Sequence, residues 1–380
     1  MMISAVRWCV LIIAGSTSVA VPGGAQLVRW TLTEPSAVSI GGEGDPQTQF
    51  LRIGGVAFTD AHEILVANTS SQELRVFDAR GQFLRSYGRS GSGPGEFRRM
   101  SWVARSNDSL FLYDFGQRRV SVFSARTGFL GSTQLPALSA MEVSYPVGRL
   151  ANGEFVVLPV KPASAEHSDG TYRDSIRVGV APANPRGRVV WLGNFPYMTR
   201  LAINPSITGR PMPPGIYRFG PGFHVAATAD RVWIGDSGQA ELGAFDATGR
   251  MVTQARLPWT PRPFDEAAFN RARHRELDGV RDDRDRVTIS AHYDARYRPQ
   301  TEPFFSRLIP SRSGSLWVER YRTDPGDAAE YLVLDRAGKP MAQLSGPPGF
   351  APYEVGDDYV LGVSRDADGV ETVVMYHLGK

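Results

Sequence analysis

Histidines are the residues of this chain that could most readily form a zinc site or act as a general base. The six histidines occupy positions 62, 167, 224, 274, 292 and 377. No pair has the HxH or HExxH spacing that brings two imidazoles to one metal ion. The sequence also lacks a GxSxG nucleophile turn, a GxxxxGK[ST] phosphate loop and a GxGxxG segment after a strand. We therefore predict no catalytic residue and no transition-metal site.

Two short acidic tracts, Asp324–Asp327 and Asp366–Gly369, carry carboxylates that could bind calcium. Neither tract has the complete alternating ligand pattern or the final glutamate of an EF-hand loop. Solvated turns are therefore the favoured interpretation of both. No cofactor is predicted, and calcium or another divalent ion is the alternative.

The composition describes a turn-rich globular protein. Of the 380 residues, 42% are apolar, 40 are Gly and 27 are Pro, and this Gly and Pro content is above average. Basic residues exceed acidic ones by only 42 − 39 = 3, and all of them except Lys161, Lys339 and Lys380 are arginines. Because acidic residues are interleaved throughout, this small excess does not indicate nucleic-acid binding.

The first 25 residues have the layout of a secretory signal peptide. Arg7 gives a positive start, the run 8–14 is apolar, and small residues lead to Ala25. The run is shorter than the roughly 20 residues of a membrane-spanning helix, although an uncleaved anchor is the alternative. We expect cleavage after Ala25 and a periplasmic or secreted protein with no membrane span. The mature chain would contain no cysteine, because Cys9 leaves with the signal peptide.

Three segments of the chain repeat one pattern. Ile64–Asn68, Leu110–Asp114 and Val232–Asp236 are short apolar runs that end in Asn or Asp. A Phe follows nine residues later, at 77, 123 and 245, and a Gly-containing turn comes soon after it. The linker 41–50 (GGEGDPQTQF) recurs 47 residues later as 88–97 (GRSGSGPGEF). Such runs, bounded by Gly, Asp, Asn and Pro, indicate antiparallel strands.

A unit of about 40 to 50 residues with four such strands is one blade of a β-propeller. Five blades are predicted near 50–88, 97–134, 146–194, 216–258 and 304–345. Residues 350–378 supply three strands of a sixth blade, and Val38–Ile40 is available as its outer strand. We therefore predict an all-β, six-bladed propeller of four-stranded antiparallel blades that forms one domain over 26–380. Its N-terminal strand closes the last blade and so removes an exposed edge.

The linker GxGPGEF, the strand endings VAN and LYD, and the segment RVFD with its Gly turn resemble the NHL-type six-bladed β-propellers. The likeness is greatest to the secreted bacterial proteins described as 6-bladed β-propellers, and it extends over 27–380. It implies interaction roles in general without naming a partner, since one such fold hosts unrelated functions. In this pattern the repeated Asn or Asp should hold the next turn, and the Phe should pack between blades.

All long insertions fall on one side of the predicted ring. The turns between the first and second strands of a blade, and between the third and fourth, are brief; together they form what we call the short-turn face. Loops between second and third strands and links between blades emerge at the opposite, long-loop face. The long ones are about 159–175, 194–216, 258–303 and 320–330. Loops of this length usually bind or cover something, so the long-loop face is the predicted working face.

The longest insertion, about 258–303 between blades four and five, contains one predicted helix. Asp265 and Glu266 open it with acidic residues that suit a helix N-terminus. The helix continues over Ala267–Val280, and the charged run 281–286 marks its exit. We expect it either to cover the central channel or to pack beside the rim.

Residues that enter the first strand of a blade should surround the channel at the long-loop face; they include Arg52, Arg98, Arg99, Tyr217, Arg218 and Glu354. Arginines there would favour an anionic ligand through paired hydrogen bonds, unless they pair with local carboxylates such as Glu96. The tract after the predicted helix brings further polar aromatic residues to this face. The predicted ligand-binding residues are Arg52, Arg99, Tyr217, Arg218, His292 and Tyr293.

The sequence thus predicts an exported, monomeric propeller that binds an unidentified small molecule or protein through its long-loop face. We favour a binding role over an enzymatic one and leave the enzyme open as an alternative. The alternative is a propeller enzyme of the lactonase or lyase type with a divalent metal in the central channel, which requires carboxylate, Asn or His side chains from several blades to converge there. A purely structural scaffold is the third possibility.

Overall fold

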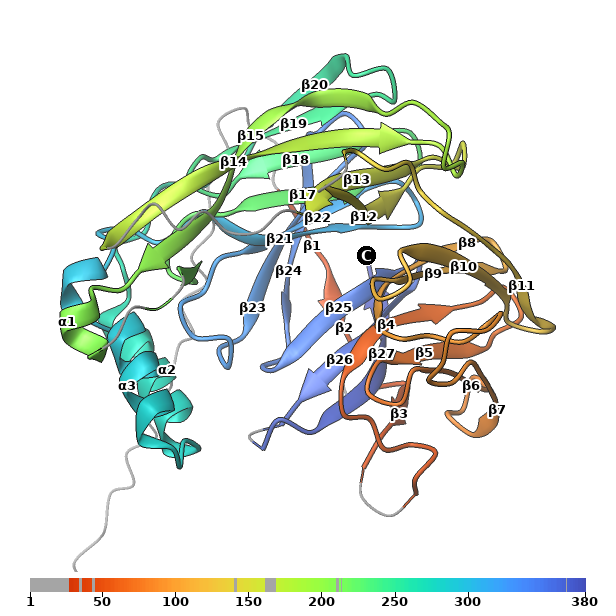
Figure 1. Cartoon of the computed structure of the whole chain (residues 1–380), viewed down its shortest axis with the longest axis horizontal. Coiled ribbons are helices and arrows are strands. Elements are labelled where there is room, and N and C mark those ends of the chain that lie inside the picture. The colour runs from red at the N-terminus through yellow and green to blue at the C-terminus, as the bar shows by residue number, and fades with distance from the viewer. Residues whose placement is uncertain are drawn as a thin grey trace, which may run out of the picture.

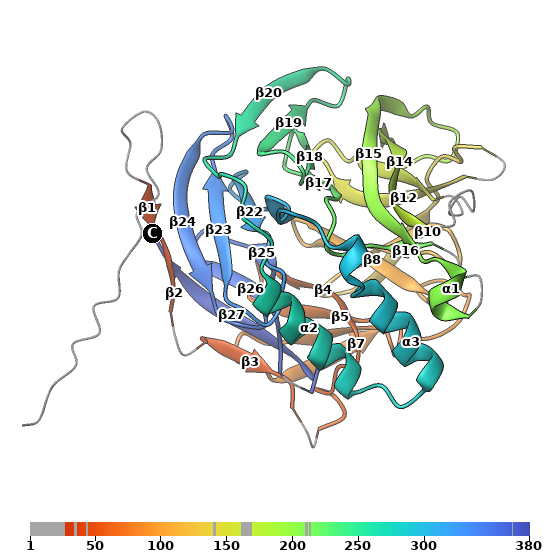
Figure 2. The ribbon, with the colours of Figure 1, turned by 90° about the vertical axis from the view of Figure 1, so that its left-hand side faces the viewer.

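The computed structural model describes residues 27–33, 36–42, 45–139, 142–160, 169–209, 212, 214–366 and 368–380. The predicted signal peptide 1–25, the segment 161–168 of one predicted loop, and His167 within it lie outside these residues. The described strands form six sheets arranged as a ring (Figures 1 and 2). None of the described helices is long and apolar enough to cross a membrane.

Each blade is an antiparallel sheet of strands that are neighbours in sequence. Blade one contains β4 (Ile53–Phe58), β5 (Ile64–Asn68), β6 (Glu73–Phe77) and β7 (Phe83–Tyr87). Blade two contains β8 (Met100–Ser106), β9 (Ser109–Asp114), β10 (Arg119–Ser124) and β11 (Gly128–Thr133). Blade three contains β12 (Val143–Arg149), β13 (Phe155–Val160), β14 (Gly170–Ala181) and β15 (Val190–Ala202), with β16 (Gly215–Ile216) added beside β15.

The second half of the ring follows the same plan. Blade four contains β17 (Phe223–Ala227), β18 (Val232–Asp236), β19 (Glu241–Phe245) and β20 (Met251–Arg256). Blade five contains β21 (Phe305–Pro310), β22 (Leu316–Arg320), β23 (Ala329–Leu334) and β24 (Pro340–Gly346). Blade six contains β25 (Phe350–Val355), β26 (Tyr359–Arg365) and β27 (Glu371–Gly379). The first strand of each blade contacts the first strand of the next, including β25 with β4. The predicted six-bladed, all-β propeller is therefore confirmed.

The N-terminal segment closes the ring, as predicted. β3 (Val38–Ile40) pairs antiparallel with β27, the last strand of blade six. Two further short strands were not predicted: β2 (Thr31–Leu32) also pairs with β27, and β1 (Val28–Arg29) pairs in parallel with β24 of blade five. Trp30 lies between them and is buried, with its ring 6.2 Å from that of Trp317. The segment therefore joins blade five to blade six.

The repeated Phe and Gly residues have the predicted structural roles. Phe77 and Phe123 are fully buried, and Phe245 is half-buried. Four glycines at turns between third and fourth strands have φ between 80° and 89°: Gly81, Gly128, Gly249 and Gly338. Glycine adopts this left-handed conformation without strain. In each of these blades the strand register shifts beside the turn, as expected for a glycine bulge in a hairpin.

The repeated Asn and Asp residues hold turns, as predicted. Asn68 accepts a hydrogen bond of 2.8 Å from the Ser70 hydroxyl, and Asp236 accepts one of 3.0 Å from the Gly238 N–H. Asp114 is completely buried and also accepts hydrogen bonds from the backbone N–H groups of Arg98 and Arg99, at 2.7 and 3.0 Å. It therefore fixes the chain that enters β8.

Blade three extends farther than the other blades at the long-loop face. Its strands β14 and β15 contain 12 and 13 residues, and they run toward the helices (Figure 1). The predicted link 194–216 was therefore wrong at its start, because residues 194–202 still belong to β15. Pro196 is tolerated there because the strand register shifts beside it, where Arg173 and Ser175 face Thr199 and Pro196.

The insertion between blades four and five contains two α-helices instead of the one predicted. α2 (Glu266–Asp278) is the predicted helix, and α3 (Asp283–His292) follows it. The run 281–286 does not mark an exit, because Asp282 accepts hydrogen bonds from the N–H groups of Arg284 and Asp285 and so caps a new helix. The 3₁₀ turn η1 (Ala295–Tyr297) ends the helical part, and the short α1 (Pro205–Thr208) lies in the preceding link.

Candidate functional site

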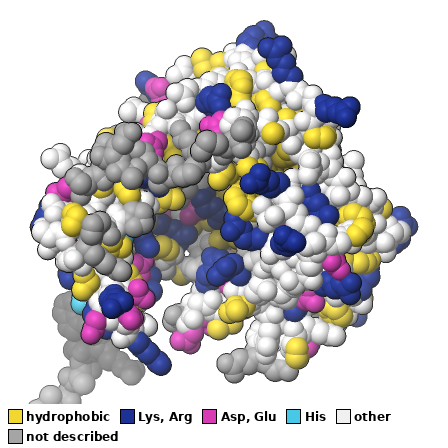
Figure 3. Space-filling view, in the orientation of Figure 1, with side chains coloured by type: hydrophobic (Ala, Val, Ile, Leu, Met, Phe, Trp, Pro, Cys, Tyr) yellow, Lys and Arg dark blue, Asp and Glu magenta, His cyan; other side chains and the backbone are white. Residues whose placement is uncertain are grey.

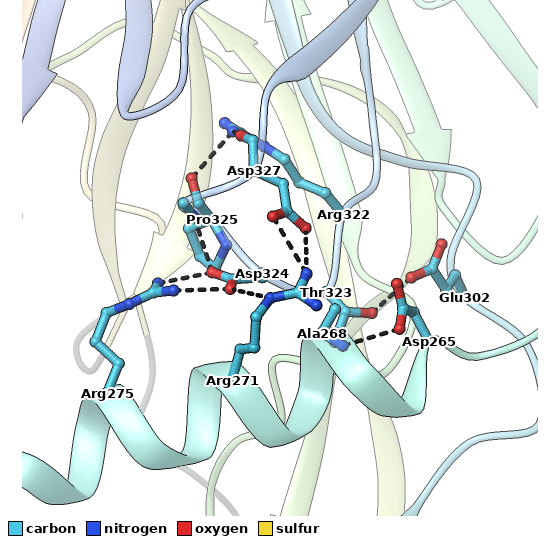
Figure 4. Close-up of polar contacts among 11 residues, drawn as sticks. Asp265, Ala268, Arg271, Arg275, Glu302, Arg322, Thr323, Asp324, Pro325 and Asp327 are labelled. Carbon is cyan, nitrogen blue, oxygen red and sulfur yellow. Dashed lines mark hydrogen bonds and ion pairs between the residues drawn. The ribbon is translucent and has the colours of Figure 1, made fainter. Parts of the chain in front are cut away.

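Helix α2 is anchored to blade five by a buried carboxylate. Asp324 lies in the loop between β22 and β23 and is 1% exposed. Arg275 donates to its two oxygens at 2.6 and 2.7 Å, and the Arg271 Nε lies 3.4 Å from it (Figure 4). Arg271 also contacts Asp327 at 2.9 Å. The two arginines are four residues apart on α2, so they project from the same side of the helix.

This contact corrects the interpretation of the acidic tract Asp324–Asp327 as a solvated turn. Burial by itself would raise the pKa of Asp324, but the hydrogen bonds from Arg275 and the Gly326 N–H hold it below its usual range. Asp324 is therefore ionised at neutral pH and anchors the insertion. The second acidic tract does form a turn, in which Asp366 accepts hydrogen bonds from the N–H groups of Asp368 and Val370.

The chain that returns from the helices to blade five is fixed as well. The Thr323 hydroxyl donates to the buried Glu302 carboxylate at 2.6 Å, and burial raises the pKa of Glu302. The Phe304 N–H donates to the carbonyl of Ser237 in blade four at 2.7 Å. The C-terminal end of the insertion is thus held on blades four and five, and in Figure 2 its helices lie in front of the ring.

An aromatic cluster packs the helices onto the link that precedes blade four. Its buried residues come from β15, that link and the insertion: Leu201, Ile203, Tyr217, Phe219, Phe269, Ala272, Ala291, Tyr293 and Tyr297. The Tyr293 ring lies 5.3 Å from that of Phe219 and 5.0 Å from that of Phe269, centroid to centroid. Tyr293, a predicted ligand-binding residue, is therefore placed in the core of the insertion, 4% exposed.

A cavity of about 560 Å³ opens between the insertion and blade three. Its walls come from the start of β14, from the end of β15 with the following link, and from the segment after α3; they include Asp169, Thr171, Thr199, Tyr217, Arg296 and Arg298. All of these elements belong to the long-loop face. Segments more than a hundred residues apart in the sequence therefore form one concave surface.

Hydrogen bonds hold the polar groups of this cavity in place. The Tyr297 hydroxyl donates to Asp169 at 2.7 Å, and together with Asn204 it holds the pKa of this carboxyl below its usual range. The Tyr217 hydroxyl donates to the Tyr297 carbonyl at 2.8 Å, and burial raises the pKa of Tyr217. Arg298 donates to both oxygens of Glu266 at 2.6 and 2.5 Å. The cavity wall thus carries the negatively charged Asp169 and the positively charged Arg298, and hydrogen bonds hold both side chains in place.

The remaining predicted residues fall into two groups. Arg218 forms an ion pair with Glu276 of α2, and His292 is half-buried at the end of α3, where its Nδ1 lies 3.0 Å from the Thr288 carbonyl oxygen. Together with Tyr217 and Tyr293 they lie at the insertion. Arg52 and Arg99 are exposed at the entries to blades one and two, so the structure places them apart from the other four in the fold.

Glu354 was expected at the long-loop face and lies at the short-turn face instead. It is the fifth residue of β25, near the end of that strand. It accepts hydrogen bonds from the Phe58 N–H at 3.2 Å and the Tyr359 hydroxyl at 2.5 Å. Arg105 and Arg312 lie 4.0 and 3.9 Å from Glu354, and each is 2.7 Å from Asp60. We call this group the short-turn cluster: Asp60, Arg105, Arg312, Glu354 and Tyr359.

Metal donors do not converge in the part of the chain that the structure describes. No group of three or more His, Cys, Asp or Glu residues there is placed to hold a metal ion. His224, on the first strand of blade four, packs its ring 5.1 Å from that of Phe305. Burial lowers its pKa to about 4, against an opposing effect of Asp236, so its imidazole is neutral at physiological pH.

Comparisons with known proteins support the fold. Residues 46–155 match the family described as 6-bladed beta-propeller, while no curated protein matches the chain. A member of the DUF4221 family from Bacteroides vulgatus has a similar structure, with a TM-score of 0.53 and 10% identity over 93% of this chain and 99% of that one. At this identity the similarity concerns the fold alone.

Two further solved structures are less similar. A Bacteroides fragilis protein whose description gives export as a prediction has a TM-score of 0.48 and 12% identity, over 92% of this chain and 95% of its own. Virginiamycin B lyase from Staphylococcus aureus has a TM-score of 0.42 and 8% identity, over 92% of this chain and 99% of its own. The chain is a six-bladed β-propeller, and its finer assignment to the NHL type stays a prediction.

Proposed function

We propose that this propeller is an exported binding module and that its long-loop face is the working face. The observation that carries the proposal is the cavity of about 560 Å³ between blade three and the insertion. Ligand sites are typically concave and largely formed in advance, with a few fixed polar groups. This cavity has these properties, because hydrogen bonds hold Asp169, Tyr217 and Tyr297.

The anchoring of the insertion supports the same proposal. Asp324 fixes α2 to blade five, and the aromatic cluster fixes both helices to the link before blade four. A wall held at both ends keeps its shape without a ligand, which lowers the ordering cost of binding. The enzyme alternative gains no support of this kind, because the described residues offer no converging set of metal donors.

Export rests on the sequence of the first 25 residues. Cleavage after Ala25 would leave Gln26 as the first residue, two positions before the start of β1 at Val28. Expression of the full chain in a bacterium, followed by cell fractionation and mass spectrometry, tests this step. We expect the protein in the periplasm or the medium with Gln26 at its N-terminus; a cytoplasmic chain that retains residues 1–25 would contradict export.

Saturation-transfer NMR with glucuronate tests the cavity. Glucuronate combines hydroxyl groups, which can donate to Asp169, with a carboxylate. The carboxylate can accept from the terminal N–H groups of Arg296 and Arg298 that their ion pairs with Asp294 and Glu266 leave free. Thr171→Trp places a large ring at an exposed position of the cavity wall, and Thr127→Trp makes the same change in an exposed turn of the short-turn face. We expect saturation transfer with the unaltered protein and with Thr127→Trp, and its loss in Thr171→Trp. Equal transfer in both variants, or none in the unaltered protein, would contradict the proposal.

A further inference from the structure

Four arginines at the long-loop face of blades one and two have no carboxylate partner among the described residues, whereas Arg75 and Arg89 pair with Glu73 and Glu96. Arg52 and Arg99 enter the first strands of their blades, Arg98 precedes Arg99, and Arg118 lies in the turn between β9 and β10. All four are exposed. Within the described ranges of the chain, none of these side chains has a carboxylate partner within 4.0 Å; Arg98 donates only to the Ser92 hydroxyl, at 2.7 Å.

Several other arginines of this face pair with carboxylates. Arg218 pairs with Glu276, and Arg298 with Glu266. Arg271 and Arg275 share Asp324, and Arg173 pairs with Asp236 at 2.8 Å. Arg52, Arg98, Arg99 and Arg118 differ from these five arginines, because no described carboxylate lies within 4.0 Å of their side chains. Figure 3 shows Lys and Arg side chains around the hollow near the middle of the view.

The backbone under Arg98 and Arg99 is fixed in advance. The buried Asp114 accepts hydrogen bonds from both of their N–H groups and from the Gly116 N–H at 2.8 Å. The next N–H, that of Met100, donates to Gln72 of blade one at 2.7 Å. The Asp114 carboxylate thus accepts hydrogen bonds from backbone N–H groups inside the blade. The Arg98 and Arg99 side chains start from a backbone segment that is fixed to blades one and two, and we call this segment the corner.

Arg99 is also oriented by an aromatic ring. Its guanidinium carbon lies 4.0 Å from the centre of the Phe115 ring, and the Phe115 ring lies 6.2 Å from that of Tyr145 in blade three. A guanidinium that stacks by its face keeps its N–H edges free for hydrogen bonds in the plane. Those edges match the two oxygens of a carboxylate or a phosphate group.

We propose that this corner is an oxyanion-binding site that takes a carboxylate or phosphate group of a ligand. Arg99 supplies the paired hydrogen bonds, Arg98 and Arg118 add charge beside it, and Arg52 extends the basic surface onto blade one. The site shares no residue with the cavity at blade three. The proposal of an oxyanion site therefore does not depend on the function proposed for that cavity.

Isothermal titration calorimetry of the mature protein at low ionic strength tests the site, with citrate and inorganic phosphate as separate probes. Arg99→Gln removes the charge and the paired donors, while Arg99→Lys keeps only the charge. The matched control is Arg256→Gln, because Arg256 is 82% exposed on the outer strand of blade four. Thermal melts check folding, which should be unaffected because the Arg99 backbone contacts remain.

We expect citrate, phosphate or both to bind the unaltered protein. Arg99→Gln should weaken this binding about tenfold, as expected for one lost charge-assisted interaction, and Arg99→Lys should weaken it less. Citrate alone would identify a carboxylate ligand, and phosphate alone a phosphate ligand. Binding of neither probe, or equal weakening by Arg256→Gln, would overturn the proposal, and a null result with glucuronate at the cavity would not affect it.

Discussion

Two groups of arginines, one on each face of this propeller, differ in their pairing with carboxylates. On the short-turn face, Arg105 and Arg312 both contact Asp60 at 2.7 Å and lie close to Glu354. These residues come from four blades, and some of their contacts join blades that are not neighbours in the ring. On the long-loop face, Arg52, Arg98, Arg99 and Arg118 have no carboxylate partner among the described residues. Arginine side chains thus connect blades at the short-turn face, whereas these four arginines face solvent at the long-loop face.

The two groups of arginines are therefore expected to have different roles, one in the stability of the fold and the other in ligand binding. A buried charge that loses its partner lowers the stability of the fold. We therefore expect substitutions in the short-turn cluster to destabilise the ring of blades. An exposed arginine without a partner contributes little to folding, and it keeps its hydrogen-bonding capacity for a ligand. The four predictions that follow probe this contrast, from the largest expected effect to the smallest.

Removal of the Glu354 side chain should have the largest effect. Glu354→Ala leaves Arg105, whose side chain is 9% exposed, short of one carboxylate and leaves the Tyr359 hydroxyl without its acceptor. We expect a loss of about 3 kcal/mol in the free energy of unfolding, measured by urea denaturation. Glu354→Gln keeps an acceptor oxygen and should cost about 1 kcal/mol. Equal losses in the two variants would show that the charge, and not the hydrogen bonds, is decisive.

The pH dependence of the free energy of unfolding should reflect the titration of His224, which lies between blades four and five. Its pKa is about 4 in the folded protein and about 6.5 when unfolded. A group with a depressed pKa contributes stability that is present above pH 6.5 and is lost as the pH falls toward 4. From pH 6.5 to 5 we expect a loss of about 1.6 kcal/mol, because the slope reaches about 1.4 kcal/mol per pH unit only well below the unfolded pKa.

Urea unfolding at several pH values measures this loss. His224→Gln should remove most of it, because glutamine does not titrate. His274→Gln, at an exposed position of α2, is the matched control and should keep the full loss. A pH dependence that is the same in both variants would mean that other groups cause it.

Removal of the Asp324 charge should act locally, on the insertion. Asp324→Asn weakens the contacts of Arg271 and Arg275, which are each half-exposed, so the loss should be smaller than for a fully buried pair, about 1.5 kcal/mol. Hydrogen exchange should become about tenfold faster in α2 and α3 and remain unchanged in blades one and two. Asp327→Asn, at a half-exposed partner of Arg271, should change exchange little. Faster exchange throughout the ring would contradict a local anchor.

The smallest effect is expected for an unpaired arginine. Arg52→Gln should change the free energy of unfolding by less than about 0.5 kcal/mol. The matched variant on the other face is Arg105→Gln, which breaks contacts with Asp60 and Glu354 and should cost about 2 kcal/mol. Both are measured by urea denaturation under the same conditions. A larger loss for Arg52→Gln than for Arg105→Gln would remove the distinction between the two faces.

Much of the fold could be predicted because its signals are local. The glycine at 81, 128 or 249 permits a left-handed turn within a few residues of the Phe that packs beside it. The closure by Val38–Ile40 could be predicted because blade six was one strand short. β1, with two residues, and β2, also with two, could not be predicted, since segments so short carry no periodic pattern.

The candidate site was predicted less completely. The entries to the first strands were identified, so Arg52, Arg99 and Arg218 were placed on the correct face. Asp169 and Arg296 were missed, because nothing in the sequence relates the start of β14 to the segment after α3. The Asp324 contact had one available signal, the spacing of two arginines four apart on α2. Glu354 was misplaced because its position depends on the start of β25 at Phe350.

The sequence by itself determined the blades, the closure of the ring and the face that carries the long loops. The blades and the long-loop face depend on strand patterns and turns within about 50 residues. The closure followed from the count of strands, which left blade six one short, without its outer strand. Tertiary structure alone decided which arginines are neutralised. Arg275 pairs with Asp324, which is 49 residues away in the sequence, and Arg312 pairs with Asp60, which is 252 residues away. The pairing of a charge depends on distances in space, which repeat patterns along the chain do not specify.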